Sequence, residues 1–268
     1  MADLAMMGAL LMAVGALVGL LAGLLGVGGG VVLVPAFAAV LSASGHDGPD
    51  MMRICVSTSL STIFVTSIRS TMAHHRKGSV DWAVLRAWAP WIAVGALSGM
   101  AVVTGLDTRQ MKIVFGALVP GFALYMAFGS PDWRLGAHLP TGWLRAVLAI
   151  PIGLTGVLLG IGGGVLGVAS MTLYGQPLRK AVGTAAGFGA LIAAPSVAGL
   201  FWVGATNAPP GTVGSVNLPM FAVIVAMTML TAPMGAALAH RVDAKLLRRI
   251  FAAFLIVVAL NMLRQASG

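Results

Sequence analysis

The chain has 268 residues, of which 59% are hydrophobic and only 9% are charged. Soluble domains carry about 25% charged residues, so this composition excludes an ordinary water-soluble protein. The net charge of +9 resides mainly in short loops between apolar segments, as in membrane proteins whose basic loops set their orientation. We therefore expect the lipid bilayer as a partner, and no nucleic acid.

Eight apolar segments are candidates for membrane-spanning helices, which need about 17–25 residues. In chain order they cover residues 8–42, 54–73, 82–104, 110–128, 143–174, 181–204, 218–239 and 245–263. The first and the fifth are too long for one ordinary crossing. Each is interrupted by glycine, at residues 26–30 (Gly-Val-Gly-Gly-Gly) and at residues 160–164 (Gly-Ile-Gly-Gly-Gly).

The two interruptions belong to an internal duplication. Gly26 and Gly160 are separated by half of the chain length, and a Leu-Leu pair precedes both of them. Further along, Thr58 corresponds to Thr184. Such duplications are the usual construction of secondary transporters. The sequence thus predicts two membrane repeats, residues 1–134 and 135–268, that form one transport domain.

Loop charges predict how the two repeats are oriented. The loop after the second segment carries Arg76 and Lys77, whereas its counterpart at 205–217 carries no charge. Basic loops stay in the cytoplasm, so equivalent loops face opposite sides and the repeats are inverted. Both termini of the multi-pass protein then lie in the periplasm of a bacterial inner membrane. The basic residues expected on the periplasmic side are Arg53, Arg109, Lys112 and Arg264.

Inverted repeats require an odd number of crossings in each half, so each glycine-broken segment must enter the membrane and return. It does so either as a re-entrant helical hairpin or as two short full crossings. We expect the hairpin. The predicted fold is an all-α polytopic membrane protein with two inverted-topology repeats, each a glycine-broken re-entrant helical hairpin followed by three transmembrane helices.

The glycine breaks form the first candidate site. A glycine-rich break leaves the first amides of the following half-helix without partners, and these amides, with the helix dipole, favour anion binding. Two inverted copies would bring two such helix ends to one site near the middle of the bilayer. Alternatively, the glycines only allow close helix packing. The residues predicted to bind substrate here are Gly28, Gly29, Gly30, Val31, Gly162, Gly163, Gly164 and Val165.

Hydroxyl side chains of the second segment are the next candidates. Thr58, Thr62 and Thr66 are spaced by four residues and share one helix face. We predict that Thr58 and Thr62, with the equivalent Thr184 of the second repeat, donate hydrogen bonds to an oxyanion. Alternatively, these hydroxyls bond back to carbonyl groups of their own helix.

Basic residues at the start of two helices are the third candidates. Arg53 opens the second helix, and Arg179 and Lys180 open the sixth at the equivalent repeat position. We predict that they raise the local anion concentration at the two entrances, although they could equally be anchors at the membrane interface. No residue pattern indicates catalysis, a metal site or a cofactor. The single cysteine, Cys55, excludes an intramolecular disulfide.

The two glycine segments and their flanks resemble a known family. Residues 19–30 read GLLAGLLGVGGG, residues 153–164 read GLTGVLLGIGGG, and residues 179–184 read RKAVGT at the start of the sixth helix. In these motifs, and in the order of segments along nearly the whole chain, the sequence is similar to the sulfite exporter TauE/SafE family of anion permeases. The resemblance implies export of sulfite or of a small organosulfonate such as sulfoacetate.

The sequence therefore predicts a secondary transporter that moves a small sulfur-containing anion outward. The membrane potential is the simplest energy source, because outward movement of one negative charge is favoured by about 2.3 kcal/mol per 100 mV. H+ or Na+ as a coupling ion stays open, as does a homodimer. Two alternative functions also stay open: a passive anion channel, and a membrane scaffold or assembly protein without transport.

Overall fold

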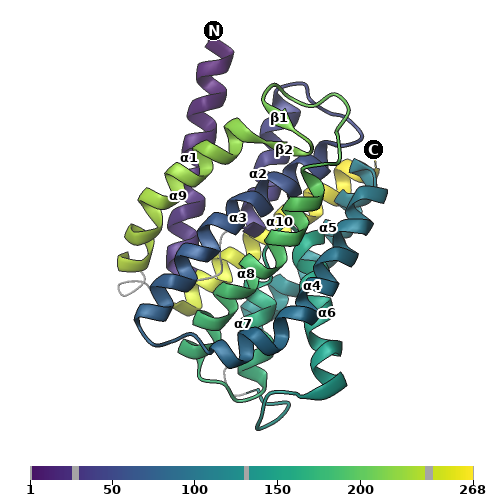
Figure 1. Ribbon diagram of the computed structural model, residues 1–268. Coiled ribbons are helices and arrows are strands. Elements are labelled where there is room, and N and C mark those ends of the chain that lie inside the picture. Colours follow the sequence, from purple (N-terminus) through teal and green to yellow (C-terminus); the bar gives the residue numbers. More distant parts are fainter. Residues whose placement is uncertain (1, 26–29, 130–132, 239–243, 268) are drawn as a thin grey trace.

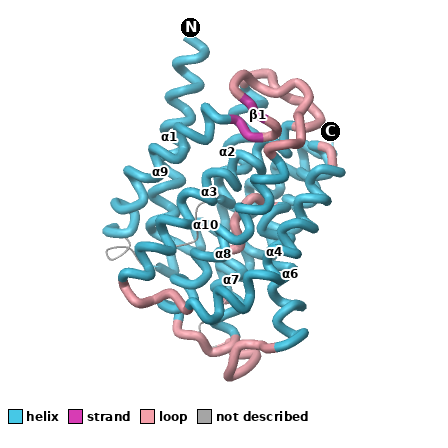
Figure 2. Tube along the Cα trace, viewed as in Figure 1, coloured by secondary structure: helices cyan, strands magenta, loops and turns pink. Residues whose placement is uncertain are grey.

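The computed structural model of the chain describes residues 2–25, 30–129, 133–238 and 244–267. Within these ranges the chain forms ten helices and one two-stranded β-hairpin (Figure 1, Figure 2). The elements are α1 (Ala2–Leu25), α2 (Gly30–Ala43), α3 (Met51–Arg76), α4 (Trp82–Gly105), α5 (Thr108–Phe128), α6 (Gly142–Leu158), α7 (Gly164–Leu173), α8 (Leu178–Leu200), β1 (Thr212–Val213), β2 (Val216–Asn217), α9 (Leu218–Leu238) and α10 (Ala244–Ser267).

Six helices of the described ranges are long and apolar enough to cross a membrane, namely α3, α4, α5, α8 and most of α9 and α10. Large apolar side chains such as Leu124, Leu230 and Val257 are exposed on their outer faces. A continuous apolar exterior suits contact with lipid and not with water. These helices confirm the prediction of an all-α polytopic membrane protein. Of the six, α3 is the most buried, so its side chains face the protein interior.

The second glycine interruption folds as a helical hairpin. Residues 159–163 form a turn between α6 and α7. The backbone N–H of Leu135 donates to the carbonyl of Leu173 at 2.7 Å, so the hairpin ends beside the residues that precede it. The ten residues of α7 extend about 15 Å, half of the hydrocarbon thickness, so α7 is too short to cross. In the first interruption, residues 26–29 lie outside the described ranges.

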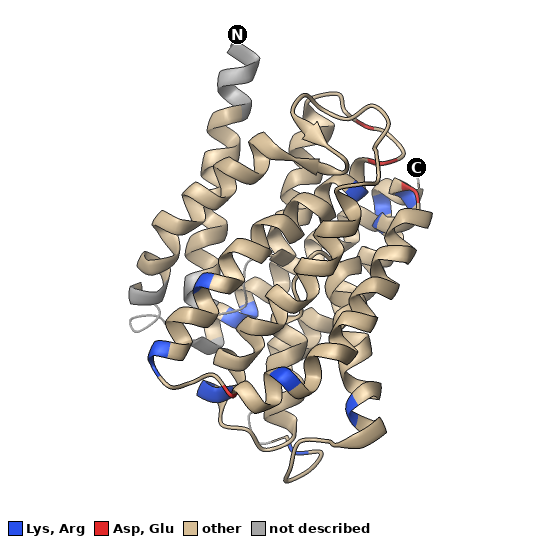
Figure 3. Cartoon of the chain, in the orientation of Figure 1, with Lys and Arg blue, Asp and Glu red and all other residues tan. Residues whose placement is uncertain are grey.

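The two ends of the molecule differ in charge. At one end α1 begins and α10 ends, beside residues 44–50 and 201–217; we call this end the terminal face (Figure 1). Residues 74–81, 133–141 and 174–180 lie at the opposite end. We call it the basic face, because Lys and Arg outnumber acidic residues there (Figure 3). The charges are thus distributed as in a protein held across a bilayer.

The two halves of the chain interlock through close glycine contacts. Gly19 of α1 packs against the backbone of Thr228 of α9. Gly153 of α6 packs in the same way against the backbone of Ile92 of α4. A Cβ atom at either glycine would overlap the neighbouring backbone, so only glycine allows this approach. The first helix of each half therefore packs along a helix of the other half.

Candidate functional site

A cavity of about 670 Å³ extends from the glycine turn between α6 and α7 to the basic face. Residues from both halves of the chain line it, on α1, α2, α3, α7, α8 and α9. Its inner wall contains Gly162 and Gly164 of the glycine turn, and α3 contributes a row of hydroxyl side chains. The residues of the wall that carry a hydroxyl group are Thr62, Thr66, Ser67, Ser70 and Thr228.

Left-handed backbone conformations explain why this turn needs glycine. Gly160, Gly162 and Gly163 have φ angles of +61°, +67° and +69°, a region in which other residues are strained. Gly163 forms the N-cap of α7. Among the described residues, the amides of the following first turn have no backbone acceptor before Gly167, whose N–H donates to the Gly163 carbonyl at 2.8 Å. Unpartnered amides at a helix start favour an anion.

The predicted glycine residues divide into two groups. Gly162 and Gly164 line the cavity, whereas Gly163 packs against Ile152 and Ile192, and the buried Val165 follows behind the wall. Gly28 and Gly29 lie outside the described ranges. Both Gly30 and Val31 are buried, and a Cβ atom on Gly30 would lie 2.6 Å from the Gly160 carbonyl oxygen. The start of α2 and the glycine turn therefore lie against each other, but Gly30 and Val31 are not part of the cavity wall.

Two kinds of hydroxyl group line the cavity. Thr62 donates to the Thr58 carbonyl at 3.0 Å, and Thr66 donates to the Thr62 carbonyl at 3.0 Å. Their hydroxyl hydrogens are thus engaged within α3, which is the alternative considered for them above. Ser67 and Ser70 also line the cavity, but their side chains have no hydrogen-bond partner among the described residues. These two serines are therefore the hydroxyls ready to donate to a ligand.

Thr58 and Thr184 lie outside the cavity wall and make equivalent contacts. The Thr58 hydroxyl oxygen accepts a hydrogen bond from the Asn217 N–H at 3.0 Å, directly before α9. The Thr184 hydroxyl oxygen accepts one from the Asp81 N–H at 2.9 Å, directly before α4. Asn217 and Asp81 each cap the helix that they precede. The two threonines therefore tie α3 and α8 to corresponding helix starts at opposite ends of the molecule.

The predicted entrance residues occupy different environments. Arg53 is only 8% exposed and donates to the Gly204 carbonyl at 2.9 Å, while its guanidinium also pairs with Asp50 at 2.9 Å. Arg179 and Lys180 are exposed on the basic face but are not part of the cavity wall. Three basic side chains that do belong to that wall are Arg69, Arg76 and Lys77.

The contacts of Arg53 belong to a network that holds the terminal face together. The Asp50 carboxylate accepts hydrogen bonds from the N–H and the hydroxyl of Thr206, both at 2.8 Å. Burial by itself would raise the pKa of Asp50, but these hydrogen bonds and the Arg53 charge outweigh it and lower the pKa. The carboxylate therefore stays ionised at neutral pH and links the start of α3 to residues 201–217.

Buried side chains of α2 and α3 separate the cavity from the terminal face. Phe37, Val56 and Leu60 have no exposed surface, and they lie on the terminal side of Thr62 and Leu33 along their helices. Among the described residues, the wall of the cavity therefore reaches the basic face and not the terminal face, where the Arg53 network lies. The sequence indicated the glycines and the hydroxyl side chains of α3 at Thr62 and Thr66. It did not single out Ser70, or Arg69, Arg76 and Lys77 as residues of the site.

Comparisons relate the chain to known proteins. The family model described as "Sulfite exporter TauE/SafE" matches residues 11–262. A "Probable membrane transporter protein" of Haemophilus influenzae is 32% identical over 255 residues, which cover 93% of this chain and 95% of that protein. A protein of the same description in Methanocaldococcus jannaschii is 26% identical over 257 residues, covering 95% and 94% of the two chains. No solved structure shows a significant match.

Proposed function

This chain belongs to the sulfite exporter TauE/SafE family of membrane transporters, and from that premise we propose that it exports a small sulfur-containing anion, such as sulfite or a sulfoacetate-like organosulfonate. The observation that carries the proposal is the cavity. It combines a glycine turn and two serine hydroxyls, whose donors have no partner among the described residues, with basic residues around its opening. All three features stabilise negative charge.

The proposed binding mode places the oxyanion at the inner end of the cavity. The amide of Gly164 and the hydroxyls of Ser67 and Ser70 donate hydrogen bonds to it, and Thr62 contributes after its hydroxyl rotates. By inverted symmetry, the start of α2 at Gly30 completes the site from the other half. Among the described residues, the wall of the cavity contains hydrogen-bond donors and no carboxylate, a combination that favours anions over cations.

The proposed orientation places the basic face in the cytoplasm of a bacterial inner membrane and both termini in the periplasm. The cavity is then open to the cytoplasm. Arg69, Arg76 and Lys77 attract anions to its mouth, and the exposed Arg179 and Lys180 add to that field. Outward transport of a monoanion would be favoured by about 2.3 kcal/mol per 100 mV of membrane potential. A coupling H+ or Na+, or a homodimer, would add to this scheme without changing it.

The inverted repeat supplies the proposed mechanism of alternating access. Repeats 1–134 and 135–268 would exchange conformations, which closes the basic face and opens the terminal face. The matched contacts of Thr58 with Asn217 and of Thr184 with Asp81 support this relation. In the outward-open state Arg53 would leave the Asp50 and Gly204 partners and face the exit, as an entrance residue from that side.

Anion flux from liposomes tests the proposal. With the purified chain incorporated, sulfite efflux should saturate with internal sulfite and should accelerate when sulfite or sulfoacetate is present outside. A positive potential on the receiving side should increase the rate, because the moving charge is negative. Flux that neither saturates nor shows such acceleration would indicate a channel. If no tested anion is transported and none stabilises the protein thermally, the alternative of a membrane scaffold without transport is supported.

A further inference from the structure

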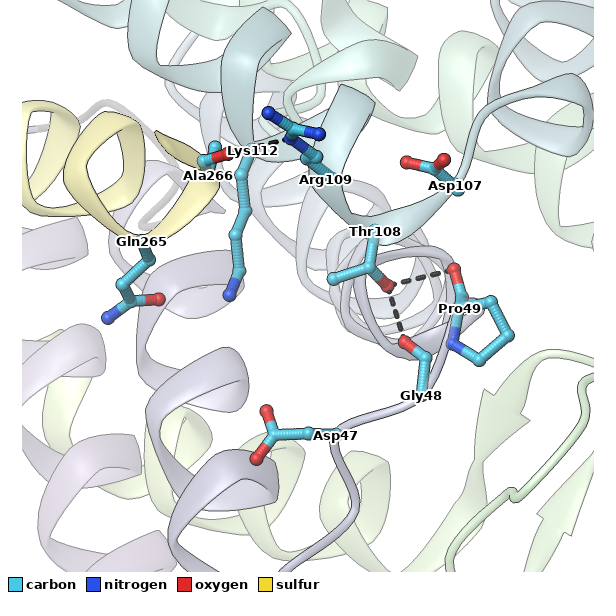
Figure 4. A pocket seen from close by; sticks show the side chains of 9 residues that line it. All are labelled: Asp47, Gly48, Pro49, Asp107, Thr108, Arg109, Lys112, Gln265 and Ala266. Atoms are coloured by element: carbon cyan, nitrogen blue, oxygen red, sulfur yellow. Dashed lines mark hydrogen bonds between the residues drawn. The ribbon is translucent and has the colours of Figure 1, made fainter. Parts of the chain in front are cut away.

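A second pocket lies at the terminal face, at the opposite end of the molecule from the cavity. Figure 4 shows the residues that line it. It has a volume of about 450 Å³ and lies between residues 47–49, the start of α5 and the end of α10. It shares no residue with the cavity. The polar side chains in its wall are Asp47, Asp107, Thr108, Arg109, Lys112 and Gln265.

Lys112 is the residue that points to a ligand. It is only 9% exposed, and its side chain extends into the pocket, between Gln265 and Asp47 (Figure 4). Within the described ranges, the ammonium has no hydrogen-bond acceptor and no carboxylate oxygen within 4.0 Å. The ammonium is therefore surrounded mainly by protein and opens only onto the pocket. A negative group that enters the pocket would gain a charge-assisted hydrogen bond from it.

The other charged groups of the wall are already engaged. The Asp107 carboxylate caps the start of α5 by accepting from the Gln110 N–H at 2.7 Å. The Asp47 carboxylate accepts from a serine hydroxyl of α2. Arg109 donates through Nε to a carbonyl at the end of α10 at 2.7 Å. These bonds hold the wall in place and leave the Lys112 ammonium as the charge without a partner.

We propose that this pocket binds an oxyanion with a single negative charge, with the Lys112 ammonium as its main contact and the Gln265 amide as a second donor. Two basic and two acidic side chains line the pocket, so a second negative charge on the ligand would be repelled by Asp47 and Asp107. A sulfonate and the phosphodiester of a lipid headgroup share this chemistry. Ile113, which follows Lys112 on α5, and Leu260, which precedes Gln265 by five residues on α10, have exposed apolar side chains that suit contact with lipid.

Binding of two monoanions to the full chain in neutral detergent tests the proposal. The probes are methanesulfonate and a short-chain phosphatidylglycerol, each measured with wild type, Lys112→Met and Arg264→Gln. Arg264 is a matched control, because it is exposed at the same end of α10 and is not part of the pocket wall. For at least one probe, Lys112→Met should raise the dissociation constant about tenfold or more, since a charge-assisted hydrogen bond is lost. Arg264→Gln should leave it unchanged.

The pattern of binding identifies the source of the ligand. Lysine-dependent binding of the lipid alone would assign a headgroup site, and lysine-dependent binding of methanesulfonate would assign a site for free anions. Equal affinities of wild type and Lys112→Met for both probes would overturn the proposal. Because Lys112 lies outside the cavity wall, the dependence of binding on Lys112 separates this pocket from the proposed transport site.

A labelling measurement on the unmodified chain covers the case that Lys112→Met does not fold. Acylation of Lys112 by an amine reagent, followed by mass spectrometry, should slow severalfold at saturating probe. The exposed Lys180 of the basic face is the internal control and should react at an unchanged rate. If neither probe slows Lys112 relative to Lys180, the pocket does not hold an oxyanion at this lysine.

Discussion

Hydroxyl groups of α3 with similar positions in the sequence have different hydrogen-bond partners. Ser57 donates to the Arg53 carbonyl at 2.7 Å and Ser59 donates to the Gly160 carbonyl at 2.8 Å. The first bond stays within α3, and the second fixes α3 to the glycine turn. Further along the helix, Ser67 and Ser70 face the cavity without such bonds among the described residues. A hydroxyl group that donates no hydrogen bond within the protein breaks none when it donates to a ligand.

Removing one free hydroxyl should weaken substrate binding and leave the fold intact. Ser67→Ala and Ser70→Ala should each raise the half-saturation concentration for sulfite efflux about two- to tenfold, the effect of losing one hydrogen bond worth about 0.5–1.5 kcal/mol. The matched control is Ser98→Ala on α4, whose hydroxyl bonds to its own helix and is exposed outside the cavity. Initial rates over a range of internal sulfite concentrations in liposomes measure the effect.

Thr58→Val should have the opposite effect, a loss of folding stability without a loss of substrate affinity. It leaves the buried Asn217 N–H without its acceptor, which costs about 1–3 kcal/mol of folding stability. This variant should lower the thermal unfolding temperature while the half-saturation concentration stays as in wild type. A normal unfolding temperature with a tenfold weaker substrate affinity would return Thr58 to the binding site and contradict this assignment.

At the scale of elements, the turn between α6 and α7 determines the shape of the cavity. Gly162 adopts a left-handed conformation, and a Cβ atom there would lie 2.6 Å from Cγ2 of Ile63 on α3. The turn thus depends on glycine both for its backbone and for its approach to α3. Since α7 starts at the end of this turn, any displacement of Gly162 also moves the amides of the first helical turn.

Gly162→Ala should therefore destabilise the protein and reduce transport together. The left-handed backbone costs about 1–2 kcal/mol for alanine, and the overlap with Ile63 adds about 1–3 kcal/mol. Gly121→Ala is the control, because a Cβ atom at this glycine of α5 meets no atom within 4 Å. That control should unfold at or above the wild-type temperature. Thermal unfolding in detergent and sulfite efflux, measured on the same preparations, check both effects.

An unchanged efflux rate in Gly162→Ala with a wild-type unfolding temperature would mean that the turn tolerates a side chain. The glycines would then be dispensable both for the packing of this turn and for the anion site. Reduced efflux without a loss of stability would instead place the effect at the site alone.

At the scale of the whole molecule, the cavity and the Arg53 network lie at opposite ends. One end is open between the two halves, and the other is held by Arg53, Asp50 and Thr206, which come from both halves of the chain. A transporter with inverted repeats needs this asymmetry, because only one end is open at a time. The orientation in the membrane decides whether the open end faces the cytoplasm.

Cysteine accessibility measures that orientation. In a Cys55→Ala background, Lys77→Cys on the exposed basic face should be protected from an impermeant thiol reagent in intact cells. Asn207→Cys, exposed on the terminal face, should be labelled. Both should react in open membranes, which serves as the control. Matching protection of the two positions in cells would contradict the inverted arrangement of equivalent loops, and reversed labelling would place the basic face outside.

The sequence by itself determined the membrane class, the places where helices break and which residue types occur near each break. Apolar segment length and the shortage of charge suffice for the first result, because a lipid-exposed helix needs apolar side chains along a whole crossing. Glycine runs suffice for the second, because left-handed turns such as that at Gly163 are strained for other residues. These signals are local, and the helices α3, α4, α5, α8, α9 and α10 appear close to where they were predicted.

Only the tertiary structure decided which polar residues face a cavity and which serve the fold. Thr58 and Thr184 bond to backbone groups 159 and 103 residues away, and periodicity within one helix carries no information about such partners. In the sequence, Arg53 stands at a helix start with no evident partner. In the structure its side chain is buried, and it pairs with the Asp50 carboxylate and the Gly204 carbonyl. Lys112 became notable for the reverse reason, since the packing of α5 against α10 leaves its ammonium without a partner among the described residues. The role of a side chain depends on the neighbours that folding brings to it, and these neighbours are far apart in the sequence.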